Sequence, residues 1–233
     1  MDPSEGGRPE TYRLFIAIPV PEHVKDQIEG AQDELRGALS RDRVRWSKRA
    51  QFHLTLKFLG NLEPQRLDAL THALRLACAG FGVLRLRAGG IGAFPELRRP
   101  RVIWVRVRDA RERLPLLQRA VETAVAGFTS EQLDATFHGH ITLGRCTTIK
   151  RARIDRLARL AKAMEEDKDK RPFGEWTAET IDLVRSERGP GGSRYTILAT
   201  VPLGAIGGAS GEDRGTKNGP QDQERTREPG TKH

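Results

Sequence analysis

Two short segments with the same alternating pattern place the strongest constraint on how this chain can fold. Residues 51–60 read QFHLTLKFLG, in which alternate positions are apolar: Phe52, Leu54, Leu56 and Phe58. The positions between them carry polar side chains: His53, Thr55 and Lys57. An alternation with period two predicts a β-strand that buries one face. The other face of this strand then presents a histidine and a threonine side by side.

The second segment, TFHGHITLGR at residues 136–145, places His140 and Thr142 in the same relation. Residues i and i+2 of a strand share a face, so each segment presents one imidazole and one hydroxyl together. The two histidines are 87 residues apart, which suits a duplicated unit of about that size rather than a short-period repeat. If the two units pack about a pseudo-twofold axis, their polar faces meet across a cleft.

The rest of the chain alternates strand-like and helical segments. Further strands are expected at residues 12–18, 44–46, 83–93, 101–107, 175–186 and 193–202, and helices at 19–39, 63–80, 111–128 and 150–167. Because short loops join neighbouring strands, we expect mostly antiparallel pairing. The sequence therefore predicts an α+β, bilobed and duplicated fold: two mostly antiparallel sheets flanked by helices, with the active-site cleft between the lobes.

Composition predicts where this folded domain begins and ends. Apolar residues make up 37% of the 233-residue chain, which is below the globular average. Residues 1–10 and 205–233 are rich in glycine, polar and charged residues and bury too little apolar surface to fold. We expect both ends to be disordered and residues 11–204 to form one domain of two pseudo-symmetric lobes.

The net charge of +9 is concentrated in that domain. Residues 205–233 hold five basic and five acidic side chains, and residues 1–10 hold one basic and three acidic ones. The ends therefore contribute zero and −2, which leaves about +11 for the core. A basic core favours an anionic partner such as RNA or a nucleotide. The alternative is an arginine-rich proteome in which many surfaces are basic.

Cysteine use and hydropathy bear on location. Cys78 and Cys146 lack CxxC spacing, and no secretory signal precedes them, so we expect two reduced thiols. No apolar run approaches the roughly 20 residues needed to span a membrane. We therefore expect a cytoplasmic monomer without membrane contact.

The paired histidines indicate acid–base chemistry. Histidine titrates near neutral pH, so one ring can accept a proton while the other donates one. Hydrolysis of a phosphodiester at a neighbouring hydroxyl needs both steps, activation of water and protonation of the leaving oxygen. Threonine hydroxyls and the guanidinium of Arg145, three residues beyond Thr142, would bind the phosphate oxygens.

With these motifs, the chain resembles the 2H phosphoesterase superfamily, which is named for two His-x-Thr motifs. Within it, the chain is similar to the RNA 2′,3′-cyclic phosphodiesterases, historically called 2′-5′ RNA ligases. The matching stretches are RLFIAIPVPEHV, VRW…FHLTLKFLG, GIGAFP…RRPRVIWVRV and FHGHITLGR, which together span most of residues 12–202.

This resemblance implies metal-independent hydrolysis of RNA 2′,3′-cyclic phosphate ends to 2′-phosphomonoesters, with possible 2′-5′ ligation in reverse. It implies no cofactor. The family's functional positions correspond here to His53 and Thr55 in the first motif, and to His140, Thr142 and Arg145 in the second. We assign His140 as the base that activates water and His53 as the acid that protonates the 3′ oxygen.

The chain departs from the family pattern at two places. His138 occupies a position that is often arginine in the family; it shares a strand face with His140 and is a possible substrate contact. The segment SKRAQ before the first motif lacks the proline common there. Phe94, in a glycine- and proline-containing loop, is a second possible substrate contact by stacking on a base.

Two other interpretations were weighed. His138, His140 and His53 form a pattern that can bind metal, although Asp134 is the nearest carboxylate in sequence and precedes the strand, so we predict no metal site. The other interpretation is a non-catalytic module whose cleft binds a nucleotide or an RNA end. Within the enzyme class, small cyclic nucleotides and 2′-5′ oligonucleotides are alternative substrates.

Overall fold

The computed structural model describes residues 10–131, 136–166, 173–190 and 192–204. Its strands are β1 (Tyr12–Pro19), β2 (Arg43–Trp46), β3 (His53–Leu62), β4 (Leu84–Phe94), β5 (Val102–Asp109), β6 (His140–Thr148), β7 (Gly174–Ala178), β8 (Thr180–Gly189) and β9 (Gly192–Pro202). Its α-helices are α1 (Glu22–Ala38), α2 (Leu67–Cys78), α3 (Arg113–Val125) and α4 (Arg151–Glu166). Three short 3-10 helices are η1 (Arg49–Gln51), η2 (Pro64–Arg66) and η3 (Ala126–Phe128). Apart from Glu10, the ends predicted to be disordered lie outside the described residues.

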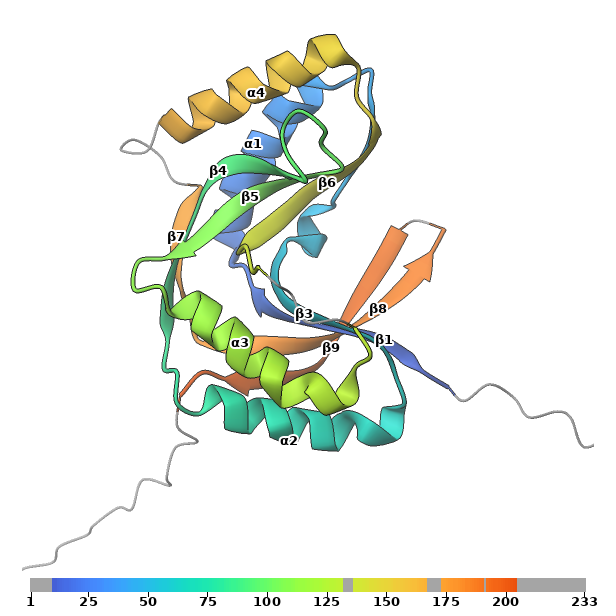
Figure 1. The fold of residues 1–233 in the computed structure, drawn as a ribbon, viewed down its shortest axis with the longest axis vertical. Helices are drawn as coiled ribbons and strands as arrows, with labels where there is room; N and C mark the ends of the chain where they lie inside the picture. Colours follow the sequence, from blue (N-terminus) through green and yellow to red (C-terminus); the bar gives the residue numbers. More distant parts are fainter. Residues whose placement is uncertain (1–9, 132–135, 167–172, 191, 205–233) are drawn as a thin grey trace, which may run out of the picture.

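All described strands belong to one curled antiparallel sheet in the order β7-β4-β5-β6-β3-β1-β8-β9, with β2 paired to β6 (Figure 1). The predicted α+β class and antiparallel pairing are confirmed. The prediction of two separate sheets is wrong, because the two halves form one continuous sheet. They are joined between β3 and β6, where the register pairs Leu54 with Ile141.

One half of the sheet takes its strands from the two ends of the folded chain, namely β1, β3, β8 and β9, and the other half is built from β2, β4, β5, β6 and β7. Helices α2 and α3 pack on the half that contains β3 and β9, and α1 and α4 pack on the half that contains β4 and β7 (Figure 1). The strand predicted at 175–186 is therefore two strands. β7 pairs with β4 in one half, and β8 pairs with β1 in the other. The chain crosses between the halves at Glu179, the one residue between β7 and β8.

The alternation predicted for the first motif breaks inside β3. Lys57 is only 3% exposed and its Nζ donates to Glu122 of α3 at 2.6 Å, whereas Phe58 is 49% exposed. The pairing with β1 skips Leu56 between its register positions, which is a β-bulge. Leu56 and Lys57 therefore both face the helices. The expectation that Lys57 lies on the polar face and Phe58 on the buried face was wrong.

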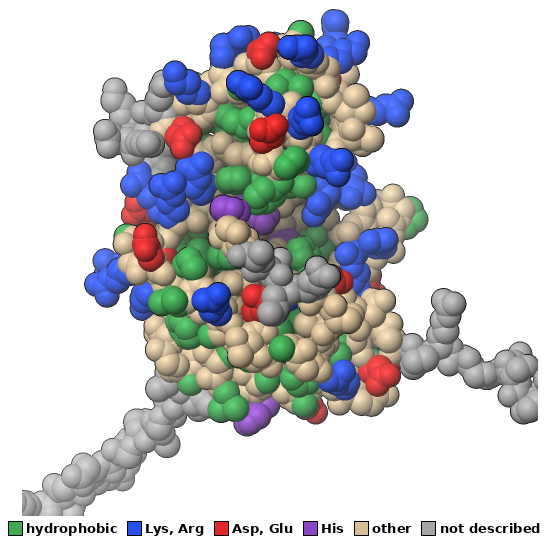
Figure 2. Space-filling model, viewed as in Figure 1, with side chains coloured by type: hydrophobic (Ala, Val, Ile, Leu, Met, Phe, Trp, Pro, Cys, Tyr) green, Lys and Arg blue, Asp and Glu red, His purple; other side chains and the backbone are tan. Residues whose placement is uncertain are grey.

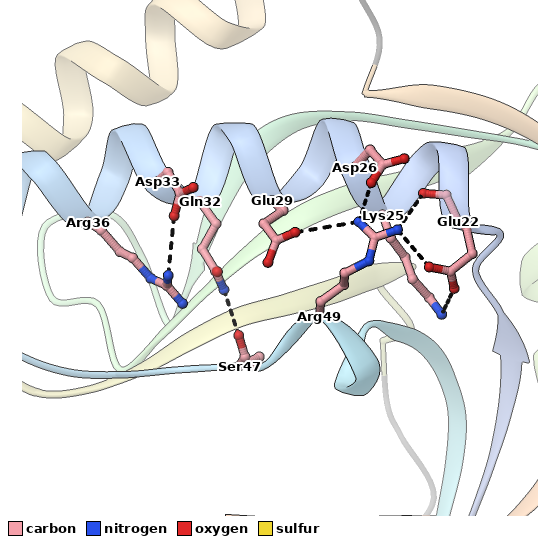
Figure 3. A network of polar contacts seen from close by, with 9 residues as sticks. All are labelled: Glu22, Lys25, Asp26, Glu29, Gln32, Asp33, Arg36, Ser47 and Arg49. Carbon is pink, nitrogen blue, oxygen red and sulfur yellow. Dashed lines mark hydrogen bonds and ion pairs between the residues drawn. The ribbon is translucent and has the colours of Figure 1, made fainter.

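Helix α1 holds the segment that leads into β3 (Figure 3). Arg49 of η1 binds the carboxylates of Glu22, Asp26 and Glu29. Deeper in the protein, Nε2 of the buried Gln32 lies 2.9 Å from the carbonyl oxygen of Ser47 and 2.9 Å from that of Leu143 in β6. One helix thus anchors the approach to the first motif and the strand of the second.

The buried ion pair between Lys57 and Glu122 gives a stability prediction. Glu122→Gln removes the negative charge that lies 2.6 Å from the buried Lys57 ammonium, and we expect it to lower the free energy of unfolding by about 3–5 kcal/mol. Urea denaturation measures this. The double variant Lys57→Met/Glu122→Leu, which removes both charges, should recover most of the loss. Asp33→Asn, at the exposed pair with Arg36, is the matched control and should cost at most about 1 kcal/mol. A similarly small loss for Glu122→Gln would contradict the prediction.

Candidate active site

The pairing of Leu54 with Ile141 brings the two His-x-Thr motifs together. Both of these side chains are fully buried in the core, so their neighbours along each strand point to the opposite face. Extending the antiparallel register by one residue sets His53 across from Thr142, and Thr55 across from His140. All four of these side chains are half-buried. The predicted convergence of two imidazoles and two hydroxyls on one face follows from this single pairing.

Each histidine is held by the carbonyl two residues before it. Nδ1 of His53 lies 2.7 Å from the carbonyl oxygen of Gln51, and Nδ1 of His140 lies 2.7 Å from that of His138. A carbonyl oxygen only accepts, so Nδ1 must carry the proton and donate in both rings. Nε2 is therefore the nitrogen that each neutral ring offers to a substrate. The two motifs repeat the same backbone contact as well as the same residues.

Burial keeps both rings neutral near pH 7. It lowers the pKa of His53 to about 4, although the hydrogen bond to Gln51 acts in the opposite direction. Burial lowers the pKa of His140 and the positive charge of Arg145 adds to the effect, although the hydrogen bond to the His138 carbonyl acts in the opposite direction. His140 also lowers the pKa of His53 electrostatically, so the two rings are close enough to influence each other.

Arg145 reaches the same face as Thr142 because of a β-bulge. In a regular strand, a residue three positions beyond Thr142 would point to the opposite face. The pairing with β5 skips Leu143, since Trp104 pairs with Thr142 but Ile103 pairs with Gly144. Arg145 is consequently exposed on the side of the two histidines. The sequence predicts that the strand ends at Arg145, but β6 continues to Thr148, and the sequence could not show this rotation.

Aromatic rings line the His140 side of the site. The ring of Phe94 lies 5.0 Å from that of His140 and 5.1 Å from that of Trp104. A Cβ at Gly92 would lie 2.1 Å from the indole of Trp104, so only glycine leaves room for this ring. His138 is exposed and its ring is 6.1 Å from Phe94. The structure therefore places the ring of Phe94 beside His140 and that of His138 near Phe94. Phe94 is the last residue of β4 rather than a loop residue, and His138 precedes β6 rather than lying in it.

Two aromatic residues that sequence reasoning did not select line the His53 side. The ring of Phe15 in β1 lies 4.7 Å from that of His53, and the ring of Tyr195 in β9 lies 5.4 Å from it. Phe58, turned outward by the bulge in β3, lies 6.0 Å from Phe15. The alternation of β1 does distinguish the face of Phe15 from the core face. No sequence signal pointed to Tyr195, which is remote in the chain.

The described residues hold no group of three or more histidine, cysteine, aspartate or glutamate side chains arranged to bind a metal ion.

Cys78 and Cys146 are free cysteines, and burial raises the pKa of each thiol to about 11. Neither thiol is therefore an activated nucleophile. Asp134, the carboxylate nearest in sequence to the histidines of the second motif, lies outside the described residues. In the part of the chain that the structure describes, no helix is long and apolar enough to cross a membrane.

The surface around the site is basic. Figure 2 shows histidine side chains in a hollow between the upper and lower parts of the molecule, with lysine and arginine side chains on either side of it. This arrangement agrees with the positive charge that the sequence assigns to the core. The site thus combines two neutral imidazoles, two hydroxyls and positive charge, a set that suits a phosphate-containing ligand.

Comparison with known proteins identifies related chains. The sequence model of the LigT-like phosphoesterase family matches residues 18–104. A protein of Aeropyrum pernix named RNA 2′,3′-cyclic phosphodiesterase is 35% identical over 67% of this chain and 84% of its own length. A Thermus thermophilus protein of the same name is 33% identical over 82% of this chain and 90% of its own. The crystal structure of E. coli LigT complexed with 3′-AMP is 25% identical and covers 83% of this chain and 99% of its own, with a TM-score of 0.62.

The environment of His53 predicts an unusual titration. We expect its ring to titrate near pH 4 and to carry its proton on Nδ1 at pH 7. Long-range ¹H–¹⁵N correlation spectra report both properties, and His53→Gln identifies the signals. The unfolded ring has a pKa of 6.5, so the unfolded state binds more protons between about pH 6.5 and 4. Stability contributed by the neutral ring is lost as the pH falls through that window. A His53 ring that is charged at pH 7 would contradict the prediction.

Proposed function

Because the chain belongs to the LigT-like phosphoesterase family of the 2H superfamily, we propose that it hydrolyses 2′,3′-cyclic phosphate ends of RNA to 2′-phosphomonoesters without a metal ion. The observation that carries the proposal is the convergence of two Nδ1-anchored histidines on one face of the sheet. The names of the relatives support the reaction class, and the 3′-AMP complex of E. coli LigT supports a nucleotide ligand.

The proposed reaction uses Nε2 of both rings. Nε2 of His140 accepts a proton from water as the water oxygen attacks phosphorus. The bond from phosphorus to O3′ breaks, and Nε2 of a protonated His53 gives its proton to O3′. The phosphate remains on O2′, so the product is a 2′-phosphomonoester with a free 3′-hydroxyl. If the 5′-hydroxyl of a second RNA takes the place of water, the same steps form a 2′-5′ linkage.

The surroundings lower the pKa of both rings, so each ring is neutral before substrate binds. The neutral ring of His140 is therefore available to accept a proton from water. His53 is also disfavoured as a cation, mainly by burial, so its protonated form is a strong acid. A bound anionic phosphate favours that protonated form. Proton donation to a poor leaving group such as O3′ benefits from a strong acid.

The remaining residues bind the substrate. Thr55 and Thr142 flank the histidines and donate hydroxyl hydrogen bonds to the non-bridging phosphate oxygens. Arg145 stabilises the charge that develops on those oxygens in the transition state. Phe94, whose ring is half-buried beside His140, offers a face to the base or ribose, with His138 at the edge of the site.

Hydrolysis in the presence of a chelator tests the proposed function directly. An oligoribonucleotide ending in a 2′,3′-cyclic phosphate should be opened fully in EDTA, and the product should be the 2′-phosphate. Chromatography against synthetic 2′- and 3′-phosphate standards distinguishes the two products. A strict need for added divalent cation would sink the metal-free mechanism. Binding without any product would favour the non-catalytic alternative.

Substitution of the histidines tests their roles. His53→Ala and His140→Ala should each lower kcat/KM by about 10²–10⁴-fold, the range typical of a lost proton transfer, while His138→Ala should cost much less. The parent rate should fall at both acid and alkaline pH. The residual activity of His140→Ala should lose its acid limb, and that of His53→Ala its alkaline limb. The opposite pattern would exchange the two roles, and an equal loss for His138→Ala would contradict the site assignment.

A further inference from the structure

Four side chains from four different strands lie on the side of the two histidines: Arg13 of β1, Arg45 of β2, Arg145 of β6 and Tyr195 of β9. Arg45 and Arg145 are opposite partners in the antiparallel β2–β6 pair, so their Cβ atoms are about 5 Å apart on one face. The ring of Tyr195 contacts that of His53. Arg13 shares a face of β1 with Phe15, whose ring lies 5.0 Å from that of Tyr195. The charges of all three arginines act on the pKa of the Tyr195 hydroxyl, which agrees with this placement.

The charges in this cluster are not balanced by nearby carboxylates. On the β8–β9 hairpin, by contrast, Arg194 binds Glu187. Among the described residues, no ion pair joins Arg13, Arg45 or Arg145 to an acidic side chain. Like charges on directly opposite strand positions repel each other, so an anion between them is stabilising. Other arginines on the surface also lack an ion pair among the described residues, but Arg45 and Arg145 directly oppose each other across two strands.

We propose that Arg13, Arg45 and Tyr195 form a second phosphate site, which receives the phosphodiester on the 5′ side of the terminal nucleotide. This inference rests on the proposed function, because it takes the cyclic phosphate to lie between His53 and His140. An RNA end whose cyclic phosphate joins O2′ and O3′ carries its next phosphate on O5′ of the same nucleoside. Together, the two sites therefore bind one nucleoside through the phosphates at both of its ends.

The chemistry of the cluster suits a phosphodiester. A guanidinium offers parallel N–H groups that match two phosphate oxygens, and the charge assistance strengthens these bonds. The Tyr195 hydroxyl stays protonated near neutral pH because burial raises its pKa, so it donates a third hydrogen bond. Arg145 lies between the two phosphates, with Thr142 on its own strand and Arg45 on the next.

Three substrates of increasing length separate the contribution of the 5′-phosphate from that of a second nucleoside. They are adenosine 2′,3′-cyclic phosphate, the same compound with a 5′-phosphate, and the dinucleotide ApA with a 2′,3′-cyclic phosphate. The full-length protein should open the second and third with a kcat/KM roughly tenfold or more above the first, as expected of charged hydrogen bonds to one added phosphate. The 5′-phosphate alone should supply most of the gain.

Variants locate the second site. Arg45→Ala and Arg13→Ala should each reduce the advantage of the 5′-phosphorylated substrate from roughly tenfold to below about threefold. Tyr195→Phe keeps the ring that packs on Phe15 and should reduce the advantage by a smaller factor. Arg75→Ala on the exposed side of α2 removes the same charge far from the cluster and should leave the advantage unchanged. Thermal melts of each variant check that it is folded.

A binding measurement keeps the two proposals distinguishable. Calorimetry compares adenosine 2′-phosphate with adenosine 2′,5′-bisphosphate, and Arg45→Ala should abolish the gain from the 5′-phosphate. If no substrate is opened, the proposed function fails, and the second site stands or falls by this comparison alone. An advantage confined to the dinucleotide would assign the gain to the second nucleoside and overturn the phosphate site. Equal values for all ligands, or an advantage that Arg45→Ala leaves intact, would also overturn it.

Discussion

The backbone pairing of Leu54 with Ile141 is the constraint on which the site depends. It joins the two halves of the sheet, and both side chains are fully buried. Because strand side chains alternate, burying this pair forces both histidines and both threonines onto the opposite face. A slip of one residue would bury the imidazoles and expose the leucine and isoleucine, so the core itself fixes the register of the site. The free energy of apolar burial thus aligns the two histidines and two threonines, whose own contacts would contribute little stability.

Two β-bulges then change the face of the sheet on which nearby side chains lie, compared with regular alternation. One turns Lys57 toward the helices and Phe58 outward, and the other brings Arg145 onto the face of Thr142. Each bulge is accompanied by a polar contact in the core. Lys57 pairs with Glu122, while the Leu143 carbonyl beside Arg145 accepts hydrogen bonds from Nε2 of Gln32 and the backbone N–H of Ser47. Without such partners, these buried polar groups would carry the cost of desolvation. The polar contacts inside the protein therefore help to determine which side chains reach the site.

These adjustments also explain what the sequence could and could not predict. Most elements and the identity of the two motifs were predictable, because hydrophobic periodicity and the repeated His-x-Thr pattern are local properties. The division of the strand predicted at 175–186 into β7 and β8 was not. The continuity of the sheet was not, since it depends on one long-range pairing between β3 and β6. Strict alternation placed Lys57 and Phe58 on the wrong faces, because a bulge is decided by both paired strands. Tyr195 was not predicted as a site residue, because only the pairing of β9 with β8 brings its ring next to that of His53.

The electrostatics of the site impose a condition on the proposed reaction. Burial and neighbouring positive charges favour the neutral form of both histidines, yet an acid–base pair needs one proton more than this resting state holds. A phosphodiester anion between the rings lowers the cost of the missing charge, because a cation beside an anion is stabilised most where water is excluded. In that case the substrate itself promotes protonation of His53, and a neutral ligand of the same shape would not. The basic surroundings that disfavour the imidazolium before binding are then the groups that attract the anion.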